Sequence, residues 1–392
     1  MFQRRVCLLV VLALAVSALA ILAVGTQAQA AGELMIGGWM LNRFYGEPGI
    51  SHFQAERVDI FFSKDVDKDI KAYVEWYYHH WVNLKPTLGS PWFLDSAFVN
   101  FTDKLGNQLR VGKGRNMCFG IVPSYGNRKH SEYGLVSETF TQERIVGAQY
   151  FGSTRNKKLD FGIAAHNALA LGTRFSGTDQ AFFRDEPTVS HFADKGEGKN
   201  LAVSARVAIP VLRTGKLGLS YRTGKLRTTD IDFLASKGLV PSVDVGVPPA
   251  VVVARATNND TNHRWGLDFN YKARSGVVAQ AEYYKAKAST LEFKGWDVLL
   301  GFEPPDPMGI KYFARYGKLD LDPPSAGDIV STLVSNQFRW DQKQLILSVV
   351  KPLRKGKPIW LQLEWIRNAE DPTGGASDVD NDVLFLELFT GF

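Results

Sequence analysis

Cysteine is nearly absent from this chain of 392 residues, which contains only Cys7 and Cys118. A disulfide-stapled secreted scaffold, a zinc knuckle and a CxxCH haem motif each need more cysteines or a closer spacing of them. Since Cys7 lies in an N-terminal export segment described below, Cys118 remains alone and no intramolecular disulfide is expected. Cysteine-ligated metal centres and covalently attached haem are therefore not expected, and the sequence predicts no cofactor.

Long hydrophobic runs are also absent after residue 30, which excludes a helical membrane protein. The one long run, Val6 to Val24, follows Arg4 and Arg5 and is closed by Ala28-Gln29-Ala30. A positive start, an apolar centre and a small-x-small end are typical of a secretory signal peptide. We expect residues 1–30 to be a cleaved signal peptide and residues 31–392 to be the mature chain, with a retained anchor as the alternative. Cleavage lowers the net charge from +6 to +4 because two arginines leave.

Charge of one sign is not concentrated anywhere, although the predicted isoelectric point is about 9.1. The basic residues are scattered among nearly as many acidic ones, so nucleic acid is not an expected partner. GxSxG, HExxH, P-loop and dinucleotide motifs are all missing, and we predict no enzyme activity. His79 and His80 alternate across a predicted strand, so they point to opposite sides of the sheet and are not favoured as a metal-binding pair. Asp378, Asp380 and Asp382 resemble a calcium loop in spacing but lack its glycine and glutamate, which favours a solvated acidic loop.

Segments of about ten residues with period-two alternation recur along the whole mature chain. In "IKAYVEWYYHH", for example, apolar and aromatic residues alternate with polar ones. Aromatic residues make up 12% of the sequence and gather near the strand ends, as they do at membrane interfaces. An exported chain with this pattern and no apolar helix predicts an all-β transmembrane antiparallel barrel. A large secreted β-sandwich or propeller is the alternative.

Seventeen segments carry the alternation, whereas bacterial single-chain barrels usually have an even number of strands. The segments are 34–44, 53–65, 69–82, 93–102, 108–119, 139–151, 158–170, 199–212, 216–227, 262–273, 277–289, 295–302, 309–320, 328–340, 343–353, 358–370 and 381–392. Short turns should lie at the periplasmic end and long loops outside. That order requires Asp328–Trp340 to belong to an outside loop, or to extend a strand above the membrane. The prediction is 16 strands, with 18 as the alternative.

The last strand, "LFLELFTGF", alternates to the final residue. One face carries Leu384, Leu386, Leu388 and Phe392, and the other carries Phe385, Glu387 and Phe389. We expect the first of these faces to contact lipid and the strand to pair with the first strand, because closure leaves no free edge.

Strand parity also predicts which charged residues line the lumen of such a barrel. The inward arginines are Arg57, Arg110, Arg206, Arg222 and Arg315, and the inward acids are Asp59, Glu75, Asp268, Glu282, Glu364 and Glu387. The third outside loop adds Arg128, Lys129 and His130 within "IVPSYGNRKHSEYG". An inward-folded loop would place cationic donors at a narrow point and attract oxyanions. The alternative is an exposed loop tip above a non-selective pore.

An ordered series of motifs resembles the phosphate-selective porin (O/P-like) family of outer-membrane barrels. The motifs include "FQAERVDIFFSKDVDKDIKAYVEW", "FLDSAFVNFTDKLGNQLRVGKGRNMCFG", "TFTQERIVG", "LGLSYRTG", "GLDFNYKARSGVVAQAEYY" and "IKYFARYGKLDL". The resemblance spans most of the mature chain. It implies a water-filled channel in the outer membrane of a Gram-negative-type bacterium, a homotrimer, an inward third loop and a preference for small anions such as phosphate. It also implies that the terminal strand is a signal read by the barrel-assembly machinery. A sleeve for a separate multihaem cytochrome and a general diffusion porin remain the alternatives.

Overall fold

The computed structural model describes residues 32–47, 50–79, 92–122, 129–131, 133–141, 144–167, 201–247, 250–372, 376–378 and 382–392. The predicted signal peptide lies outside these residues and stays a prediction. No helix within the described ranges is long and apolar enough to cross a membrane.

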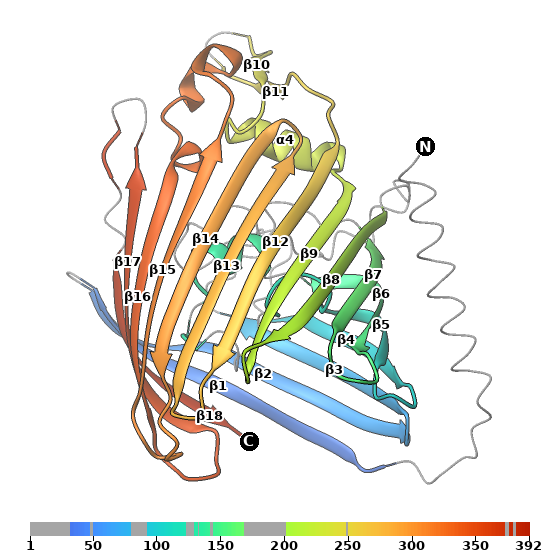
Figure 1. Cartoon of the computed structure of the whole chain (residues 1–392). Helices are drawn as coiled ribbons and strands as arrows, with labels where there is room; N and C mark the ends of the chain where they lie inside the picture. The colour runs from blue at the N-terminus through green and yellow to red at the C-terminus, as the bar shows by residue number, and fades with distance from the viewer. Residues whose placement is uncertain are drawn as a thin grey trace.

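Sixteen antiparallel strands close into one barrel (Figure 1). They are β1 (Leu34–Glu47), β2 (Ile50–Asp67), β3 (Ile70–His79), β4 (Trp92–Thr102), β5 (Gln108–Arg115), β6 (Arg144–Ser153), β7 (Asp160–Asn167), β8 (Leu201–Val211), β9 (Gly215–Lys225), β12 (Thr261–Lys272), β13 (Val277–Ala288), β14 (Leu291–Phe302), β15 (Lys311–Asp322), β16 (Asp341–Pro352), β17 (Ile359–Asp371) and β18 (Val383–Gly391). Each strand pairs with its neighbours in sequence order, and β18 pairs with β1. The predicted fold class and strand number are confirmed.

The segment between β15 and β16 is not a strand. It forms three short 3-10 turns, η2 (Ala326–Asp328), η3 (Ser331–Leu333) and η4 (Gln337–Arg339), before β16 begins. Pro323 and Pro324 follow β15 directly, and two prolines in succession cannot continue a hydrogen-bonded ladder. Of the two placements predicted for Asp328–Trp340, the loop is correct.

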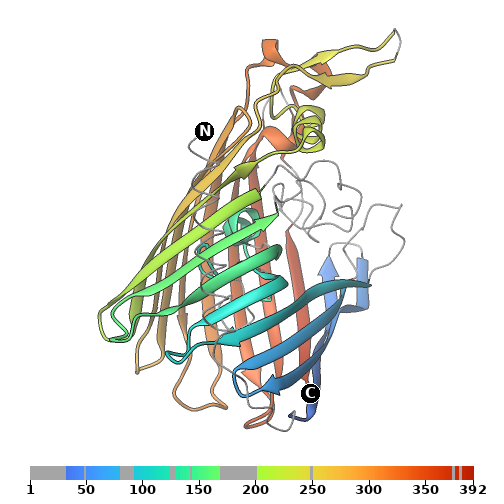
Figure 2. The ribbon, with the colours of Figure 1, turned by 90° about the vertical axis from the view of Figure 1, so that its right-hand side faces the viewer.

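Connections at the two ends of the barrel differ in length, and we call the short-turn end periplasmic and the long-loop end extracellular. Among the described residues, two short helices lie in long connections: α3 (Leu135–Phe140) between β5 and β6, and α4 (Thr228–Ser236) between β9 and β12. A separate hairpin of β10 (Ser242–Asp244) and β11 (Val253–Arg255) follows α4. Helix α4 and this hairpin stand above the extracellular end (Figure 2). The barrel wall is all-β as predicted, whereas these loops contain helix.

The terminal strand has the predicted faces. Leu384, Leu386 and Leu388 are exposed on the outer surface, whereas Phe385, Glu387 and Phe389 are buried inside. Phe392 and Gly38 exchange two backbone hydrogen bonds of 3.0 and 3.1 Å, which extends the β1–β18 pairing to the last residue. A side chain at Gly38 would collide with the Phe392 ring, so glycine is required at this close approach.

Candidate channel lumen

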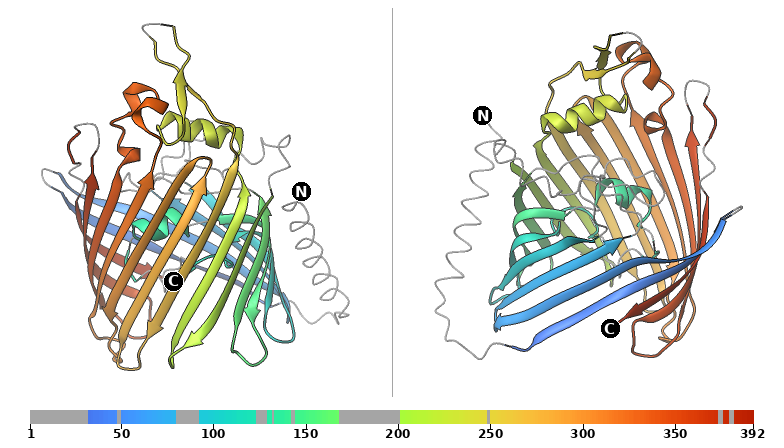
Figure 3. Two further views of the ribbon diagram at one scale, coloured as in Figure 1. Left: turned by 45° about the horizontal axis from the view of Figure 1, so that its top comes forward. Right: turned by 180° about the vertical axis from the view of Figure 1, so that it is seen from behind.

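Residues 116–143 connect β5 to β6 and form the third extracellular loop, which we call loop 3. Its described parts contact the inner face of strands all round the barrel, and Figure 3 shows α3 within the ring of strands. Backbone amides of the loop donate to side chains of Gln149 on β6, Ser220 on β9, Glu282 on β13, Gln344 on β16 and Glu364 on β17. Loop 3 is therefore folded into the barrel and is not an exposed tip.

The lowest described part of loop 3 is held by charged wall residues. The Ser131 amide donates to Glu364 at 2.9 Å, and its hydroxyl donates to Glu387. His130 is buried, with its Nδ1 2.7 Å from the Ser348 hydroxyl and 3.6 Å from the Glu364 carboxylate. These contacts hold the loop backbone against β16, β17 and β18 in the periplasmic half of the barrel.

Lys129 extends this contact to the periplasmic end. Its ammonium lies 2.8 Å from the carboxylate of Glu303, which follows β14 and also binds Lys272. Burial acts to raise the pKa of Glu303, but the two lysines act more strongly and the net pKa lies below its ordinary value. Glu303 is therefore ionised at neutral pH, and its single negative charge is shared by Lys129 and Lys272.

The ascending part of loop 3 is held by Arg315 on β15. Its guanidinium donates to the carbonyl of Tyr133 at 2.7 Å, to the Ser137 hydroxyl at 3.3 Å and to Asp297 at 3.2 Å. Gly134 has a positive φ of 83°, and a side chain there would meet Arg315. Glycine thus allows the loop to turn directly over the guanidinium.

Aromatic packing completes the attachment of α3. Phe140 stacks on Tyr284 and Phe293 of the wall, with ring centroids 5.1 and 5.4 Å apart. Val136 and Phe140 belong to a buried cluster that continues to Leu234 of α4. Apolar contacts therefore link loop 3 to the extracellular lobe.

The predicted inward arginines do lie on the inner face, but their surroundings differ. Arg57, Arg222 and Arg315 are buried to 4% exposure or less. Arg57 donates to the Ser131 carbonyl and Arg222 to Asn262. Arg128 lies outside the described residues, so its predicted role stays untested.

Arg110 and Arg206 retain exposed surface. Arg110 donates to Asn100 at 3.0 Å and lies 3.9 Å above the Phe98 ring. Arg206 is 18% exposed and forms two hydrogen bonds with Asp268, two strands away on β12. Gly218 on the intervening strand makes this bridge possible, because a side chain there would collide with both partners.

The predicted inward acids are all buried, with no more than 8% of any side chain exposed. They are Asp59, Glu75, Asp268, Glu282, Glu364 and Glu387. Among the predicted wall charges, accessible surface thus remains only on cations.

Parity reasoning missed three buried inner arginines, Arg43, Arg144 and Arg264. Arg43 binds Glu387 at 2.8 Å and Arg144 binds Asp95 at 2.9 Å. Arg264 donates to the Thr139 carbonyl of loop 3 at 3.1 Å. It shares parity with Asp268, so extending the β12 pattern by two steps would have found it. Arg43 follows an apolar inner stretch of β1, which concealed it.

Asp378 and Asp382, the described ends of the "DVDND" segment, both accept from backbone amides. Asp382 accepts from the Asn368 amide at 2.9 Å and Asp378 from the Glu370 amide at 3.2 Å. Asp380 and His80 lie outside the described residues, as does the side chain of His79. No group of three His, Cys, Asp or Glu within the described ranges is arranged to hold a metal ion.

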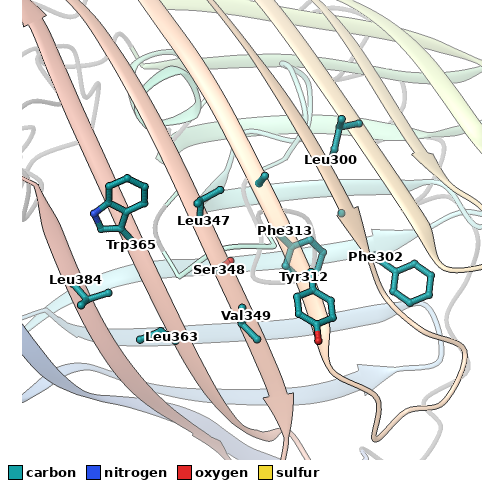
Figure 4. A pocket seen from close by; sticks show the side chains of 12 residues that line it. Leu300, Phe302, Tyr312, Phe313, Leu347, Ser348, Val349, Leu363, Trp365 and Leu384 are labelled. Atoms are coloured by element: carbon teal, nitrogen blue, oxygen red, sulfur yellow. The ribbon is translucent and has the colours of Figure 1, made fainter.

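A hollow of about 490 Å³ lies on the outside of β14–β18 and not in the lumen. Figure 4 shows Leu300, Tyr312, Leu347, Leu363 and Trp365 around it, all projecting from the outer face. The lining is almost wholly apolar, so this hollow is suited to hydrocarbon and not to a polar solute.

Comparison with solved structures identifies the class of this architecture. OmpF of Salmonella typhi in complex with daunomycin matches with a TM-score of 0.59 at 12% identity, over 92% of this chain and 98% of that one. The outer-membrane channel DcaP of Acinetobacter baumannii matches with a TM-score of 0.57 at 12% identity, over 94% and 99%. An anion-selective porin from Comamonas acidovorans matches with a TM-score of 0.50 at 11% identity, over 92% and 100%.

The chain has the closed 16-stranded fold of outer-membrane porins. No protein-family model matches it, and no curated protein does so either. The phosphate-selective family predicted from the motifs therefore gains no separate support.

Proposed function

We propose that this protein is a porin of the bacterial outer membrane, a water-filled channel for passive diffusion of small hydrophilic solutes. The observation that carries the proposal is loop 3, which crosses a polar lumen and is bound to its wall by charged groups on β13, β15, β17 and β18. A barrel of 16 strands is wide enough to enclose an aqueous channel, and a loop inside it narrows the opening. The partners proposed are outer-membrane lipid, the barrel-assembly machinery, which would read the terminal strand, and small anions.

The channel should prefer anions over cations. Arg110 and Arg206 retain accessible surface on the inner wall, whereas all six predicted acids are buried. Guanidinium groups offer paired donors to oxyanions. The motif resemblance makes inorganic phosphate the oxyanion to test first. Among these residues Arg110 is the first to test, because its hydrogen-bond partner Asn100 is neutral, whereas Lys129 and Arg206 each pair with a carboxylate.

Reversal potentials in planar bilayers test this assignment. In a potassium chloride gradient the wild type should be anion-selective, and Arg110→Glu should move the reversal potential toward cation preference. Arg155→Glu makes the same charge change in an exposed periplasmic turn and should move it much less. A conducting but cation-selective wild type would refute the anion preference and leave the channel function intact.

The cytochrome-sleeve alternative requires a lumen without an internal loop, and loop 3 occupies part of it. A cytochrome that co-purified with the barrel would nevertheless favour the sleeve. We also propose a homotrimer, in keeping with an OmpT of Vibrio cholerae described as a trimer form, which matches with a TM-score of 0.55 at 11% identity. The mass of the detergent-extracted assembly decides this point.

A further inference from the structure

A row of aromatic side chains crosses the adjacent strands β2–β6, which run from blue to green in the right-hand view of Figure 3. The ring centroids of Phe61 and Tyr73 lie 5.7 Å apart, and those of Tyr73 and Phe98 lie 5.0 Å apart. The planes of neighbouring rings differ by only 24° and 21°, so the rings stack. The Arg110 guanidinium continues the row, 3.9 Å from the Phe98 ring centroid and 5.3 Å from that of Phe151. We call these five residues the aromatic–arginine row.

Strand alternation and register place this row on the inner wall. Phe61 lies two residues from Asp59 on β2, and Tyr73 lies two residues from Glu75 on β3. Side chains two residues apart on a strand lie on the same face, and both acids are inward. Tyr73 pairs directly with Phe98 of β4, so the Phe98 ring lies on this face as well.

The rings of the row keep accessible surface, unlike other aromatic residues of the inner wall. Phe61, Phe98 and Phe151 are only partly buried, and so is Tyr73. The aromatic wall residues beneath α3 are covered, with Tyr284 at 0% and Phe293 at 3% exposure. The interior of a porin is normally polar, so the barrel itself does not require accessible rings there. They offer a surface on which a planar solute can stack.

Arg110 keeps most of its donors available beside these rings. Its Nε donates to the neutral Asn100 side chain at 3.0 Å, and among the described residues it makes no other hydrogen bond and no ion pair. By contrast, Arg206 is paired with Asp268. The two terminal nitrogens of Arg110 thus form a fork that fits a carboxylate.

Two glycines on β5 allow the ring and the guanidinium to converge. Gly112 is directly opposite Phe98, and a Cβ atom there would lie 2.3 Å from the carbonyl oxygen of Ala97. A Cβ atom at Gly114 would lie 3.1 Å from the Phe98 ring and 3.6 Å from the Arg110 side chain. Glycine inside a strand is typical of a place that another group approaches closely.

The row also lies beside the start of loop 3. Arg110 pairs in register with Gln149, whose side chain accepts from the Met117 amide at 2.8 Å. Met117 and Phe151 pack against the same buried cluster. A solute that passes the constriction at loop 3 therefore meets the aromatic–arginine row.

We propose that the aromatic–arginine row binds planar aromatic carboxylates, such as benzoate, in the lumen. The carboxylate would accept two hydrogen bonds from the terminal nitrogens of Arg110, and the ring would stack beside Phe98 and Tyr73. Inorganic phosphate lacks a ring and a neutral aromatic solute lacks the carboxylate, so each uses only one part of the row. The inference rests on the proposed channel function and names a class of solute for it.

Ligand-observed NMR titrations of the detergent-extracted full-length protein test the proposal without any conductance measurement. The probes are benzoate, cyclohexanecarboxylate, benzamide and inorganic phosphate, and the readout is the dissociation constant. Benzoate should bind most tightly. It should bind about fivefold more tightly than cyclohexanecarboxylate, which has the same charge but no aromatic ring to stack.

Two variants separate the fork from the rings. Arg110→Gln removes the charged fork and should weaken benzoate binding about 30-fold. Phe98→Leu should weaken benzoate binding about fivefold and leave cyclohexanecarboxylate binding unchanged, a difference that a general structural defect would not produce. The matched controls are Arg155→Gln in an exposed periplasmic turn and Phe62→Leu on the outer face, and both should bind like the wild type.

Wild-type benzoate affinity in folded Arg110→Gln would overturn the proposal. Equal affinity of the wild type for benzoate and cyclohexanecarboxylate would also overturn it. A conducting wild-type channel that does not bind benzoate would refute the aromatic solute and leave the channel function intact. A barrel that binds benzoate as expected but conducts no ions would support the site and refute the proposed channel.

Discussion

Replacing Arg315 with alanine should loosen loop 3 inside the barrel. The Arg315 guanidinium is 3% exposed, and it holds the Tyr133 carbonyl, the Ser137 hydroxyl and the Asp297 carboxylate together. A hydrogen bond from a charged donor contributes about 1.5–3 kcal/mol. Taking about 2 kcal/mol for the loop contacts, the ratio of attached to detached loop falls roughly 30-fold.

Other contacts of loop 3 survive in this variant, including Gln344 with the Leu135 amide and Glu364 with the Ser131 amide. We therefore expect partial release, seen as a larger single-channel conductance and stronger open-channel noise in 1 M potassium chloride. Heat-modifiable migration in gels checks that the barrel has folded.

Arg206→Ala is the matched control. It also removes an arginine from an inner-wall ion pair, but the partner is Asp268 on the wall and not a loop residue. Both variants lose stability, since a buried carboxylate is left without its counter-charge. Only Arg315→Ala should increase the noise. Folded Arg315→Ala channels with wild-type conductance and noise would show that this residue does not hold the loop.

Three further outcomes are expected. Burial raises the pKa of Glu303 and the two lysines lower it, with a net decrease. The contact of Glu303 with Lys129 therefore persists at neutral pH. It is lost only as the pH falls below the ordinary glutamate value of about 4.3. Glu303→Gln at pH 7 should release Lys129 and change the conductance traces, and wild-type traces in this variant would show that the contact does not matter for conduction. Leu388→Arg places a charge on the lipid face at a cost of about 2–4 kcal/mol near the bilayer centre and should lower the amount of barrel in the membrane fraction. Deleting Phe392 removes its two hydrogen bonds with Gly38 and should also impair assembly, whereas Phe392→Tyr should assemble normally.

The barrel could be predicted because the side chains of each strand alternate between the lipid-facing side and the lumen-facing side. Period two determined which side of β18 faces lipid, and the order of long and short connections excluded Asp328–Trp340 from the membrane-crossing strands. The short helices could not be predicted in the same way. Helix α3 has six residues and α4 has nine, too few turns for a period of 3.6 to stand out.

The direction of each lumen arginine was predictable, but its partner was not. Arg206 binds Asp268 across an intervening strand, and the contact depends on register and on Gly218. Lys129 binds Glu303, which is 174 positions away in the sequence and meets it only because loop 3 descends to the periplasmic end. The position of a residue in the period-two alternation of its strand gives the face of the sheet on which its side chain lies. Register and loop path decide whether its charge is accessible or offset.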